Sequence, residues 1–363
     1  MAEPLRFLQV GAGDMGRAWL RTLAASPDAV LVGLVDLDVD RARTAAAQEG
    51  HRGVPVATDL SALAAETGAQ ALLDVTVPAA HGAVNTEALR ADLPVLCEKP
   101  LAGSVHECLE MVATAELSGQ LLMVSQSRRY WRSLDALRDQ LGQLGGVGTV
   151  CCEFFKAPRF TGFREEMAHP LLVDMAIHHL DLARLLLGAD PVSVYCESAN
   201  PPWSWFAGDA AATAVFTFPG GQRFTYTGSW VAPGLETSWN GSWRLSAEHG
   251  TAVWDGDHPP IAFRHDEELP ARLGAGGQEI AGSLAEFVAA VRTGAEPDTV
   301  ARRNVWSVAM VEASIASTEV GGRVLLEEVL ESAYVEAVRG AEDPEVRAVL
   351  QGWSSVHEVL AAR

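Results

Sequence analysis

The sequence predicts an α/β protein of two domains, a parallel sheet in the first third of the chain and a largely antiparallel sheet after it. Its 363 residues exceed what one ordinary hydrophobic core supports. Up to about residue 126, short apolar runs alternate with helical patterns, as in repeated βα units. From about residue 190, Gly-rich turns separate strand-like runs, as in hairpins. We therefore expect domains at 1–126 and 127–335, followed by a C-terminal helical tail at 336–363.

The composition excludes several classes of partner. Hydrophobic residues make up 48% of the chain and the mean hydropathy is +0.09, which argues against global disorder. The chain has 27 Lys and Arg and 47 Asp and Glu, which gives a net charge of -20. Such a surface repels phosphate backbones and anionic lipid, so we expect no nucleic-acid and no membrane partner. With no CxxC pair, no signal sequence and no run of transmembrane length, we expect a reduced, cytoplasmic protein.

The N-terminal stretch has the order strand, glycine turn, helix. An apolar run ends at Val10, a Gly-Ala-Gly-Asp-Met-Gly turn follows, and a helical pattern with Trp19 and Leu20 on one face comes next. This context favours a Rossmann-type dinucleotide site, in which the helix N-terminus receives the pyrophosphate; the alternative is a simple turn. The predicted cofactor contacts of this turn are Gly11, Gly13, Asp14, Met15 and Gly16.

A carboxylate ends the second predicted strand. Asp36 lies 20 residues after Gly16, where an acidic side chain accepts hydrogen bonds from the adenosine ribose and repels a 2′-phosphate. This position favours NAD over NADP. Arg41 and Arg43 keep NADP open, because a nearby arginine can accommodate the phosphate. A solvated strand end without a function is the other alternative for Asp36.

The alternation continues to about residue 126. A buried strand at 71–77 precedes Pro78 and a helix through Leu89, and a short strand leads into Glu98-Lys99-Pro100. Ligands bind at the carboxyl ends of the strands of a parallel sheet. Lys99 follows such an end, and we expect it to reach toward the nicotinamide. An ordinary surface lysine is the alternative.

Six of the ten tryptophans fall between Trp203 and Trp254, in the region of the predicted second sheet. Indole faces stack on the apolar faces of sugar rings, which makes a carbohydrate or polyol ligand one interpretation. Sheet core or a subunit interface is the other. We expect one or two of these tryptophans at most to contact a substrate.

A mostly apolar helix predicted over 171–188 carries two carboxylates and two imidazoles. Asp174, His178 and Asp181 are spaced i, i+4 and i+7, so an α-helix places them on one face, while His179 lies about 100° away. A histidine between two carboxylates is typical of an oriented base. The alternatives are a buried network that satisfies itself, a helix cap, and a metal site. For the metal site we find no further ligand cluster, and none is expected.

These motifs, taken in order, resemble those of the glucose-fructose oxidoreductase, inositol dehydrogenase and MocA (Gfo/Idh/MocA) family over about residues 5–330. The resemblance implies a Rossmann domain, an α/β domain with an open, mostly antiparallel sheet, and NAD(P)-linked oxidation of a sugar, inositol or polyol hydroxyl. It also implies a homodimer or tetramer. The residues that carry it are the glycine turn, Asp36, Thr76-x-Pro78 with His81, Glu98-Lys99-Pro100, Arg128-Arg129-Tyr130 and Asp174-x3-His178.

The resemblance also implies roles for individual residues. Lys99, Asp174 and His178 match the catalytic group: His178 takes the hydroxyl proton, Asp174 orients it, and Lys99 stabilises the developing alkoxide and contacts substrate. Arg128 and Asp181 match positions near the substrate. The further cofactor contacts are Thr76, Pro78, His81, Glu98 and Lys99. Leu171-Leu172-Val173 replaces a glycine-rich turn common in the family, which affects the expected substrate. An NAD-assisted hydrolase or lyase and a non-enzymatic NAD(H) sensor remain alternatives.

Overall fold

The computed structural model describes residues 3–160 and 162–361 and divides the chain into two compact units. The first comprises 1–127, 277–305 and 332–363, and the second comprises 128–276 and 306–331. The chain therefore leaves the first unit at residue 128 and returns to it twice.

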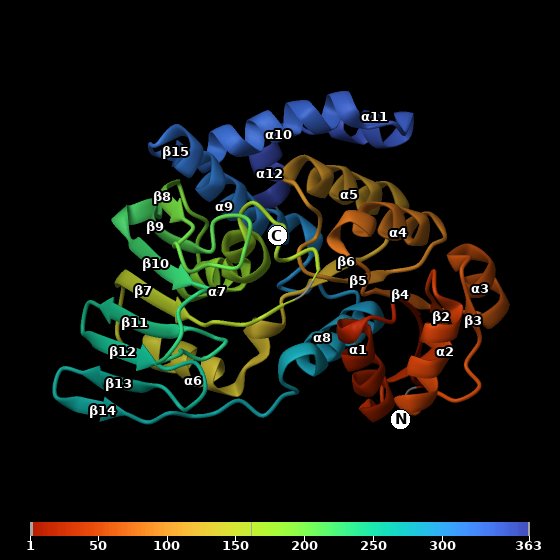
Figure 1. The fold of residues 1–363 in the computed structure, drawn as a ribbon, viewed down its shortest axis with the longest axis horizontal. Helices are drawn as coiled ribbons and strands as arrows, with labels where there is room; N and C mark the ends of the chain where they lie inside the picture. Colours follow the sequence, from red (N-terminus) through yellow and green to blue (C-terminus); the bar gives the residue numbers. More distant parts are fainter. Residues whose placement is uncertain (1–2, 161, 362–363) are drawn as a thin grey trace. The chain divides into compact units, whose positions relative to one another are not determined.

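The first unit is built on a six-stranded parallel sheet with the strand order β3-β2-β1-β4-β5-β6 (Figure 1). The order reverses between β1 and β4, and in such sheets the ligand crevice lies outside the carboxyl ends of the strands at the reversal. The strands are β1 (Leu5–Val10), β2 (Ala29–Val35), β3 (Val56–Ala57), β4 (Ala71–Asp74), β5 (Val95–Glu98) and β6 (Leu122–Ser125).

Five helices connect these strands, and their starts show why the chain is helical there. Asp38, Asp59 and Ser104 each accept a hydrogen bond from a backbone amide of the first turn that follows, which satisfies an otherwise unpaired donor. The helices are α1 (Asp14–Ala25), α2 (Val39–Gln48), α3 (Leu60–Thr67), α4 (Pro78–Arg90) and α5 (Val105–Ser118).

Two later parts of the chain complete the first unit. Helix α8 (Glu279–Thr293) packs on the sheet, and its Phe287 ring lies 5.7 Å from that of Phe7 in β1. Helix α11 (Pro344–Gly352) packs along α5, followed by α12 (Val356–Ala361). The indole of Trp353 donates a 2.9 Å hydrogen bond to the Glu116 carboxylate. The C-terminal helices are therefore part of the packed first unit.

The second unit is built on a nine-stranded sheet with the order β14-β13-β12-β11-β7-β10-β9-β8-β15. Within this second sheet, β7 and β10 are the only described neighbours that run parallel. The expected mostly antiparallel sheet is therefore confirmed. The strands are β7 (Val147–Phe155), β8 (Ser193–Ala199), β9 (Ala211–Thr217), β10 (Arg223–Ser229), β11 (Ser242–Ala247), β12 (Gly250–Trp254), β13 (Ile261–Arg264), β14 (Glu267–Leu269) and β15 (Val324–Leu325).

Helices cover one face of this sheet. Helix α6 (Arg132–Leu141) packs on β12 and β13, and α7 (Ile177–Leu187) packs on β7. Side chains in β7 alternate accordingly: Cys152 and Phe154 are buried, whereas Glu153 is exposed on the other face. Helices α9 (Ala301–Val320) and α10 (Leu326–Gly340) each run from one unit into the other.

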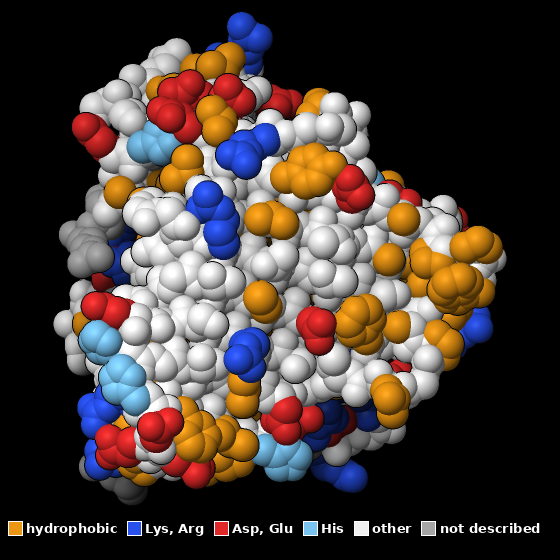
Figure 2. Space-filling model, turned by 90° about the vertical axis from the view of Figure 1, so that its left-hand side faces the viewer, with side chains coloured by type: hydrophobic (Ala, Val, Ile, Leu, Met, Phe, Trp, Pro, Cys, Tyr) orange, Lys and Arg blue, Asp and Glu red, His pale blue; other side chains and the backbone are white. Residues whose placement is uncertain are grey.

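Charged side chains of both signs are interspersed on the face drawn in Figure 2, with no single-sign field across it. In the described part of the chain, no helix combines the length and the apolar character needed to cross a bilayer.

Candidate functional site

The glycine turn after β1 is tightly built. Gly11 has φ +96°, and a Cβ added there would lie 2.5 Å from the Val75 carbonyl oxygen. At Gly16 it would lie 2.4 Å from the Gly11 carbonyl oxygen, whereas at Gly13 it would meet nothing within 4 Å. The Gln9 amide fixes the turn by donating to the carbonyls of Gly11 (2.8 Å) and Gly16 (3.0 Å). Two glycines are therefore required by packing, and Gly13 leaves open space at the N-cap of α1, where Asp14 and Met15 are exposed.

Asp36 follows β2 and faces this turn. Its Oδ2 accepts a 2.8 Å hydrogen bond from the Ala12 amide, and its Oδ1 accepts from the Asp38 amide at 2.8 Å. Nη2 of Arg41 also donates to Oδ1 at 2.9 Å. The carboxylate is only 7% exposed, while the Arg41 side chain is 58% exposed. A hydrogen bond thus connects Asp36 to the glycine turn. Arg41 donates to Oδ1 of Asp36, an oxygen that a ribose hydroxyl would also use.

His81 connects the turns that follow β4 and β5. Its Nδ1 lies 2.8 Å from the Pro100 carbonyl oxygen and its Nε2 lies 3.3 Å from that of Thr76. The ring is fully buried. Its contacts are with the backbone of both turns, so His81 holds these two turns together. Thr76 is in turn held by a 2.6 Å hydrogen bond from its hydroxyl to Asp74, and Pro78 is the first residue of α4.

Glu98 is held in the core directly before Lys99. Its Oε1 accepts a 2.8 Å hydrogen bond from the Trp19 indole, and its Oε2 accepts from the Lys99 amide at 3.1 Å. Burial raises the pKa of the Glu98 carboxyl, against the Trp19 and Lys99 interactions that lower it. Glu98 is therefore a positioning residue for the turn, and Lys99 is the partly exposed member of the pair. The Lys99–Pro100 peptide bond is cis.

A group of three potential metal ligands lies beneath these turns. One ligand atom each of Asp74, His81 and Cys97 falls within 4.8 Å of the others, and all three residues are buried. The ring nitrogens of His81 face backbone carbonyls and the Cys97 thiol donates to the Glu98 carbonyl at 3.1 Å, so these atoms already have hydrogen-bond partners. Burial raises the pKa of both Asp74 and Cys97.

The predicted cofactor residues of the first unit lie in turns at the ends of neighbouring strands. The glycine turn, Asp36, Thr76 with Pro78, and Glu98 with Lys99 follow β1, β2, β4 and β5, whose carboxyl ends share one edge of the parallel sheet.

In the second unit, the predicted helix begins differently from the expectation. Leu171–Ala176 is a π-helix, and α7 starts only at Ile177. A π-helix has i→i+5 hydrogen bonds, so the turn that carries Asp174 is wider than the α-helix that we predicted, whereas His178 and Asp181 lie in the α-helical part. Short π-helical turns often occur at functional sites. Asp174 is one of the two partly exposed residues of this turn, and His178 is 7% exposed.

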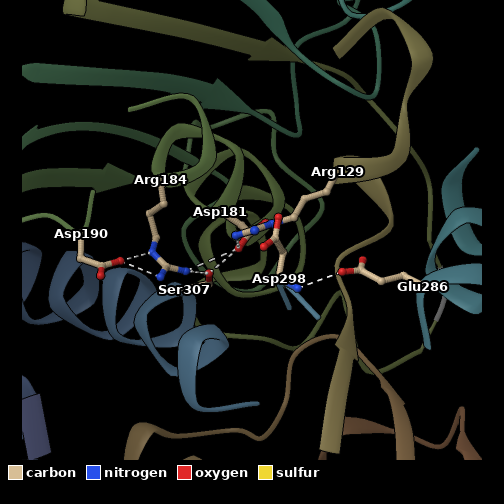
Figure 3. A network of polar contacts seen from close by, with 7 residues as sticks. All are labelled: Arg129, Asp181, Arg184, Asp190, Glu286, Asp298 and Ser307. Atoms are coloured by element: carbon tan, nitrogen blue, oxygen red, sulfur yellow. Dashed lines mark hydrogen bonds and ion pairs between the residues drawn. The ribbon is translucent and has the colours of Figure 1, made fainter. Parts of the chain in front are cut away.

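Asp181 lies in a buried ion-pair network (Figure 3). Arg129 donates to it twice, from Nε at 2.6 Å and from Nη2 at 2.8 Å, and the Ser307 hydroxyl donates at 2.7 Å. Arg184 donates to the same hydroxyl and pairs with Asp190. Burial alone would raise the pKa of Asp181, but the interactions with Arg129, Arg184 and Ser307 together outweigh burial and lower that pKa.

Asp181 is 1% exposed and accepts from Arg129 and Ser307, so this geometry supports the self-satisfied network that was one of the alternatives. Its position near the substrate stays a prediction. Arg128, the other predicted substrate neighbour in this region, donates a 2.8 Å hydrogen bond from Nη1 to the buried Asn240 side chain. The adjacent arginines of the 3-10 turn Ser127–Tyr130 thus have separate partners.

His179 does not take part in the polar site. Its ring lies among those of Phe154 (4.9 Å), Tyr226 (5.5 Å) and Trp243 (6.2 Å). Burial lowers the pKa of His179 to about 3, so the imidazole is neutral. The sequence predicts that His179 does not join Asp174 and His178. Its position among these aromatic rings agrees with that prediction.

Three connections lie at one end of the second sheet, because β10 is parallel to β7 whereas β9 and β11 are antiparallel to their neighbours. They comprise residues 156–170, 200–210 and 230–241. Half of the six tryptophans of the tryptophan-rich region are core: Trp230, Trp243 and Trp254 are almost fully buried. The exposed Trp203 and Trp239 both lie in these connections.

Arg164, in the first of these connections, was not among the residues expected at the site. Its Nε donates to Asp174 Oδ2 at 2.7 Å, so an exposed connection supplies a cation to the predicted catalytic carboxylate. The only local signal was the pattern of basic and aromatic residues at 156–164.

The comparisons with known proteins agree with this architecture. Residues 5–126 match the family model described as "Oxidoreductase family, NAD-binding Rossmann fold", and residues 137–253 match the "GFO/IDH/MocA C-terminal domain". An uncharacterized protein, y4oX of Sinorhizobium fredii, is 30% identical over 92% of this chain and 98% of its own length. Inositol 2-dehydrogenase of Renibacterium salmoninarum is 32% identical over 51% of this chain and 55% of its own. D-apiose dehydrogenase of Paraburkholderia graminis is 25% identical over 93% of both.

Solved structures share the fold at low sequence identity. An oxidoreductase from Agrobacterium radiobacter in complex with NAD+, L-tartaric acid and magnesium has a TM-score of 0.83 at 20% identity, over 91% of this chain and all of the other. A putative myo-inositol dehydrogenase from Sinorhizobium meliloti has a TM-score of 0.75 at 20% identity, over 89% and 99%.

Proposed function

Because the chain belongs to the Gfo/Idh/MocA oxidoreductase family, we propose that it is a dehydrogenase that oxidises a secondary hydroxyl of a sugar, an inositol or a related polyol. The observation that carries the proposal is the convergence of the glycine turn, Asp36 and the Glu98–Lys99 turn at one edge of the parallel sheet. The inositol 2-dehydrogenase and D-apiose dehydrogenase relatives support the substrate class.

The residues present fit NAD. Gly13 leaves open space at the N-terminus of α1 for a pyrophosphate, and Asp36 presents a buried carboxylate to the adjacent ribose position. A 2′-phosphate would meet that charge, which favours NAD, with Arg41 as the group that reduces the discrimination. When bound, NAD supplies the hydride acceptor.

We propose that His178 removes the hydroxyl proton, Asp174 stabilises the resulting imidazolium, and Lys99 donates a hydrogen bond to the oxygen as its negative charge develops. The composition supports a special role for Lys99. Of 27 basic residues 25 are arginine, and Lys99 and Lys156 are the two lysines. An ammonium is a compact point charge with three rotatable donors, unlike the planar fork of a guanidinium, which suits a single oxygen on which negative charge develops.

The test is NADH formation from NAD and a panel of inositols, aldoses and sugar acids, with Lys99→Ala alongside. We expect the variant to lose turnover by roughly 100-fold or more while NAD affinity stays nearly unchanged. Lys156→Ala is the matched control, since it removes the other lysine, and we expect it to retain turnover. Unchanged turnover in Lys99→Ala would reject the proposal. Cofactor retained through purification with no net NADH would instead favour an NAD-assisted hydrolase or lyase.

We also propose that a second copy of the chain packs on the uncovered face of the second sheet. The strand registers align seven residues in one row across that face, of which all but Thr225 and Arg244 are apolar: Tyr195, Val215, Thr225, Cys151, Arg244, Val253 and Ile261. Tyr195, Val215 and Ile261 are 38–52% exposed. Light scattering after size exclusion tests this: we expect a dimer or tetramer that Val215→Asp shifts toward monomer, and a monomeric wild type would reject it.

A further inference from the structure

Arg164 contacts Asp174 through a single nitrogen. A guanidinium has five N–H donors, which form a side-on fork (Nε with Nη2) and an end-on fork (the two Nη). Arg129 uses the side-on fork completely on Asp181 and is 12% exposed, as expected for a structural pair. Arg164 uses only Nε and is 36% exposed. Among the described residues, no other hydrogen-bond acceptor meets its Nη groups, so the end-on fork is available beside Asp174.

Arg159, five residues earlier, is a second cation of this kind. Its guanidinium lies 3.7 Å from the centroid of the Trp205 ring. Within the described parts of the chain it has no acidic partner. Stacking occupies the face of a guanidinium and leaves its N–H edges available. By contrast, Lys156 on the same connection is paired with Glu236 at 3.0 Å.

Aromatic rings hold both arginines in place. The Arg164 guanidinium lies 4.8 Å from the Phe163 ring centroid and 5.4 Å from that of Phe160. Phe160 contacts Trp230, which stacks on Phe206, and Phe206 contacts Trp205 beneath Arg159. Backbone hydrogen bonds from Ala207 and Asp209 to the carbonyls of Glu165 and Ala168 fix the connection. Positioned donors bind more tightly than mobile ones, because less side-chain freedom is lost on binding.

We propose that Arg164 and Arg159 form a subsite for an anionic substituent, a carboxylate or a phosphate, on the sugar or polyol that is oxidised. The proposal rests on the proposed function and narrows its substrate class to acidic sugars. Guanidinium groups only donate, and a planar fork matches the two oxygens of a carboxylate or phosphate better than a hydroxyl. An anion placed beside Asp174 would be repelled by that carboxylate, and Arg164 lies where it can bridge the two charges.

Three matched sugars test the subsite. Glucose, glucuronate and glucose 6-phosphate differ only at C6, which bears a hydroxyl in the first, is a carboxylate in the second and bears a phosphate in the third. Both binding, by thermal shift and calorimetry with NADH present, and kcat/KM should be measured. We expect the wild type to favour at least one anion over glucose by about tenfold or more, the range of a charge-assisted hydrogen bond. Arg164→Gln should reduce that ratio toward one, and Arg159→Gln should reduce it less. The acid that has the higher affinity and kcat/KM identifies carboxylate or phosphate as the preferred ligand group.

Arg223→Gln is the matched control, because Arg223 begins β10 at the opposite end of the strand from these connections. It should leave the ratio unchanged. Arg164→Lys keeps the positive charge but removes the planar fork. It is the second variant to measure if Arg164→Gln does not fold. A wild type that binds glucose as tightly as both acids, or a preference that survives Arg164→Gln, would overturn the subsite. Failure of the dehydrogenase proposal is distinguishable, since it would abolish NADH formation but leave the binding comparison intact.

Discussion

Arg129 holds Asp181 through two parallel hydrogen bonds of 2.6 and 2.8 Å, and this pair ties the 3-10 turn Ser127–Tyr130 to helix α7 (Figure 3). Helix α7 also carries His178. Ser307 donates to the same carboxylate, which adds α9 to the assembly. The network therefore fixes the backbone around the proposed base. Since both charges are withdrawn from water, the loss of one partner leaves the other uncompensated.

Asp181→Asn should consequently destabilise the protein. Removing one member of a buried pair costs about 3–5 kcal/mol, which corresponds to a fall in Tm of roughly 5–15 °C. Asp190→Asn is the control, because Asp190 pairs with Arg184 but its side chain is 37% exposed; its effect should be less than half as large. Differential scanning calorimetry measures both. Equal Tm values for wild type and Asp181→Asn would show that the network contributes no net stability.

The same pair predicts a defined pH dependence. The pKa of Asp181 in the folded protein is below the ordinary value of 3.8, so its contribution is complete above about pH 4 and is lost as pH falls through the folded-state pKa. The Tm difference between wild type and Asp181→Asn should stay constant from pH 7 to 5 and narrow below pH 4. Calorimetry at pH 7, 5, 4 and 3 tests this. A difference that widens on acidification would contradict the assignment.

Substitutions at two glycines of the first turn should distinguish an effect on packing from an effect on cofactor binding. Gly16→Ala places a Cβ 2.4 Å from the Gly11 carbonyl oxygen, and overpacking of this kind costs about 1–3 kcal/mol. Gly13→Ala meets nothing within 4 Å and has φ −69°, which alanine adopts without strain. We expect Gly16→Ala to lower Tm, and Gly13→Ala to keep Tm but lose NAD affinity about tenfold or more, as the methyl group faces the pyrophosphate. The opposite pattern would place the pyrophosphate elsewhere.

The first unit followed from the sequence because its signals are local. A glycine turn, an acid at a fixed distance and alternating βα units predict a parallel sheet, whose carboxyl strand ends share one edge. The two-residue strand β3 and the return of α8 to this sheet lack such a signal, since both depend on contacts distant in the chain. His81 appeared as a motif residue, but only the structure shows its ring between the Thr76 and Pro100 carbonyls.

The second unit shows where sequence periodicity stops being informative. Asp174, His178 and Asp181 match an α-helical face, yet the chain forms a π-helix through Ala176 and pairs Asp174 and Asp181 with different arginines. Nothing in a hydrophobic pattern encodes an i→i+5 turn, because the wider turn changes the backbone hydrogen bonds without changing the composition. Arg129 lies 52 residues from its partner, a separation that no local motif reports.

Arg41 should control cofactor preference. Its Nη2 lies 2.9 Å from Asp36 Oδ1, the oxygen that also accepts from the Asp38 amide, so a ribose hydroxyl must compete with it. Arg41→Ala should increase the ratio of NAD to NADP affinity about tenfold, by removing both the competitor and the partner of a 2′-phosphate. Arg43→Ala is the control, since Arg43 pairs with the fully solvated Asp40. Titration of NADH and NADPH fluorescence measures the ratio. A ratio unaffected by Arg41→Ala, or shifted equally by Arg43→Ala, would show that Arg41 does not contact this part of the cofactor.

The two adjacent histidines of α7 should respond differently to pH. His179 has a pKa of about 3 because it is buried among aromatic rings, so it stays neutral from pH 5 to 9 and contributes no titration there. If His178 is the base, kcat/KM for the substrate that the panel identifies should fall on the acid side in the wild type. His178→Gln should remove that limb and lower kcat/KM by about 100- to 10,000-fold. His179→Phe keeps the ring volume, and its pH profile should have the wild-type shape even if Tm changes. An acid limb that survives His178→Gln would mean that a different group accepts the proton, and Asp174 would then be the residue to substitute next.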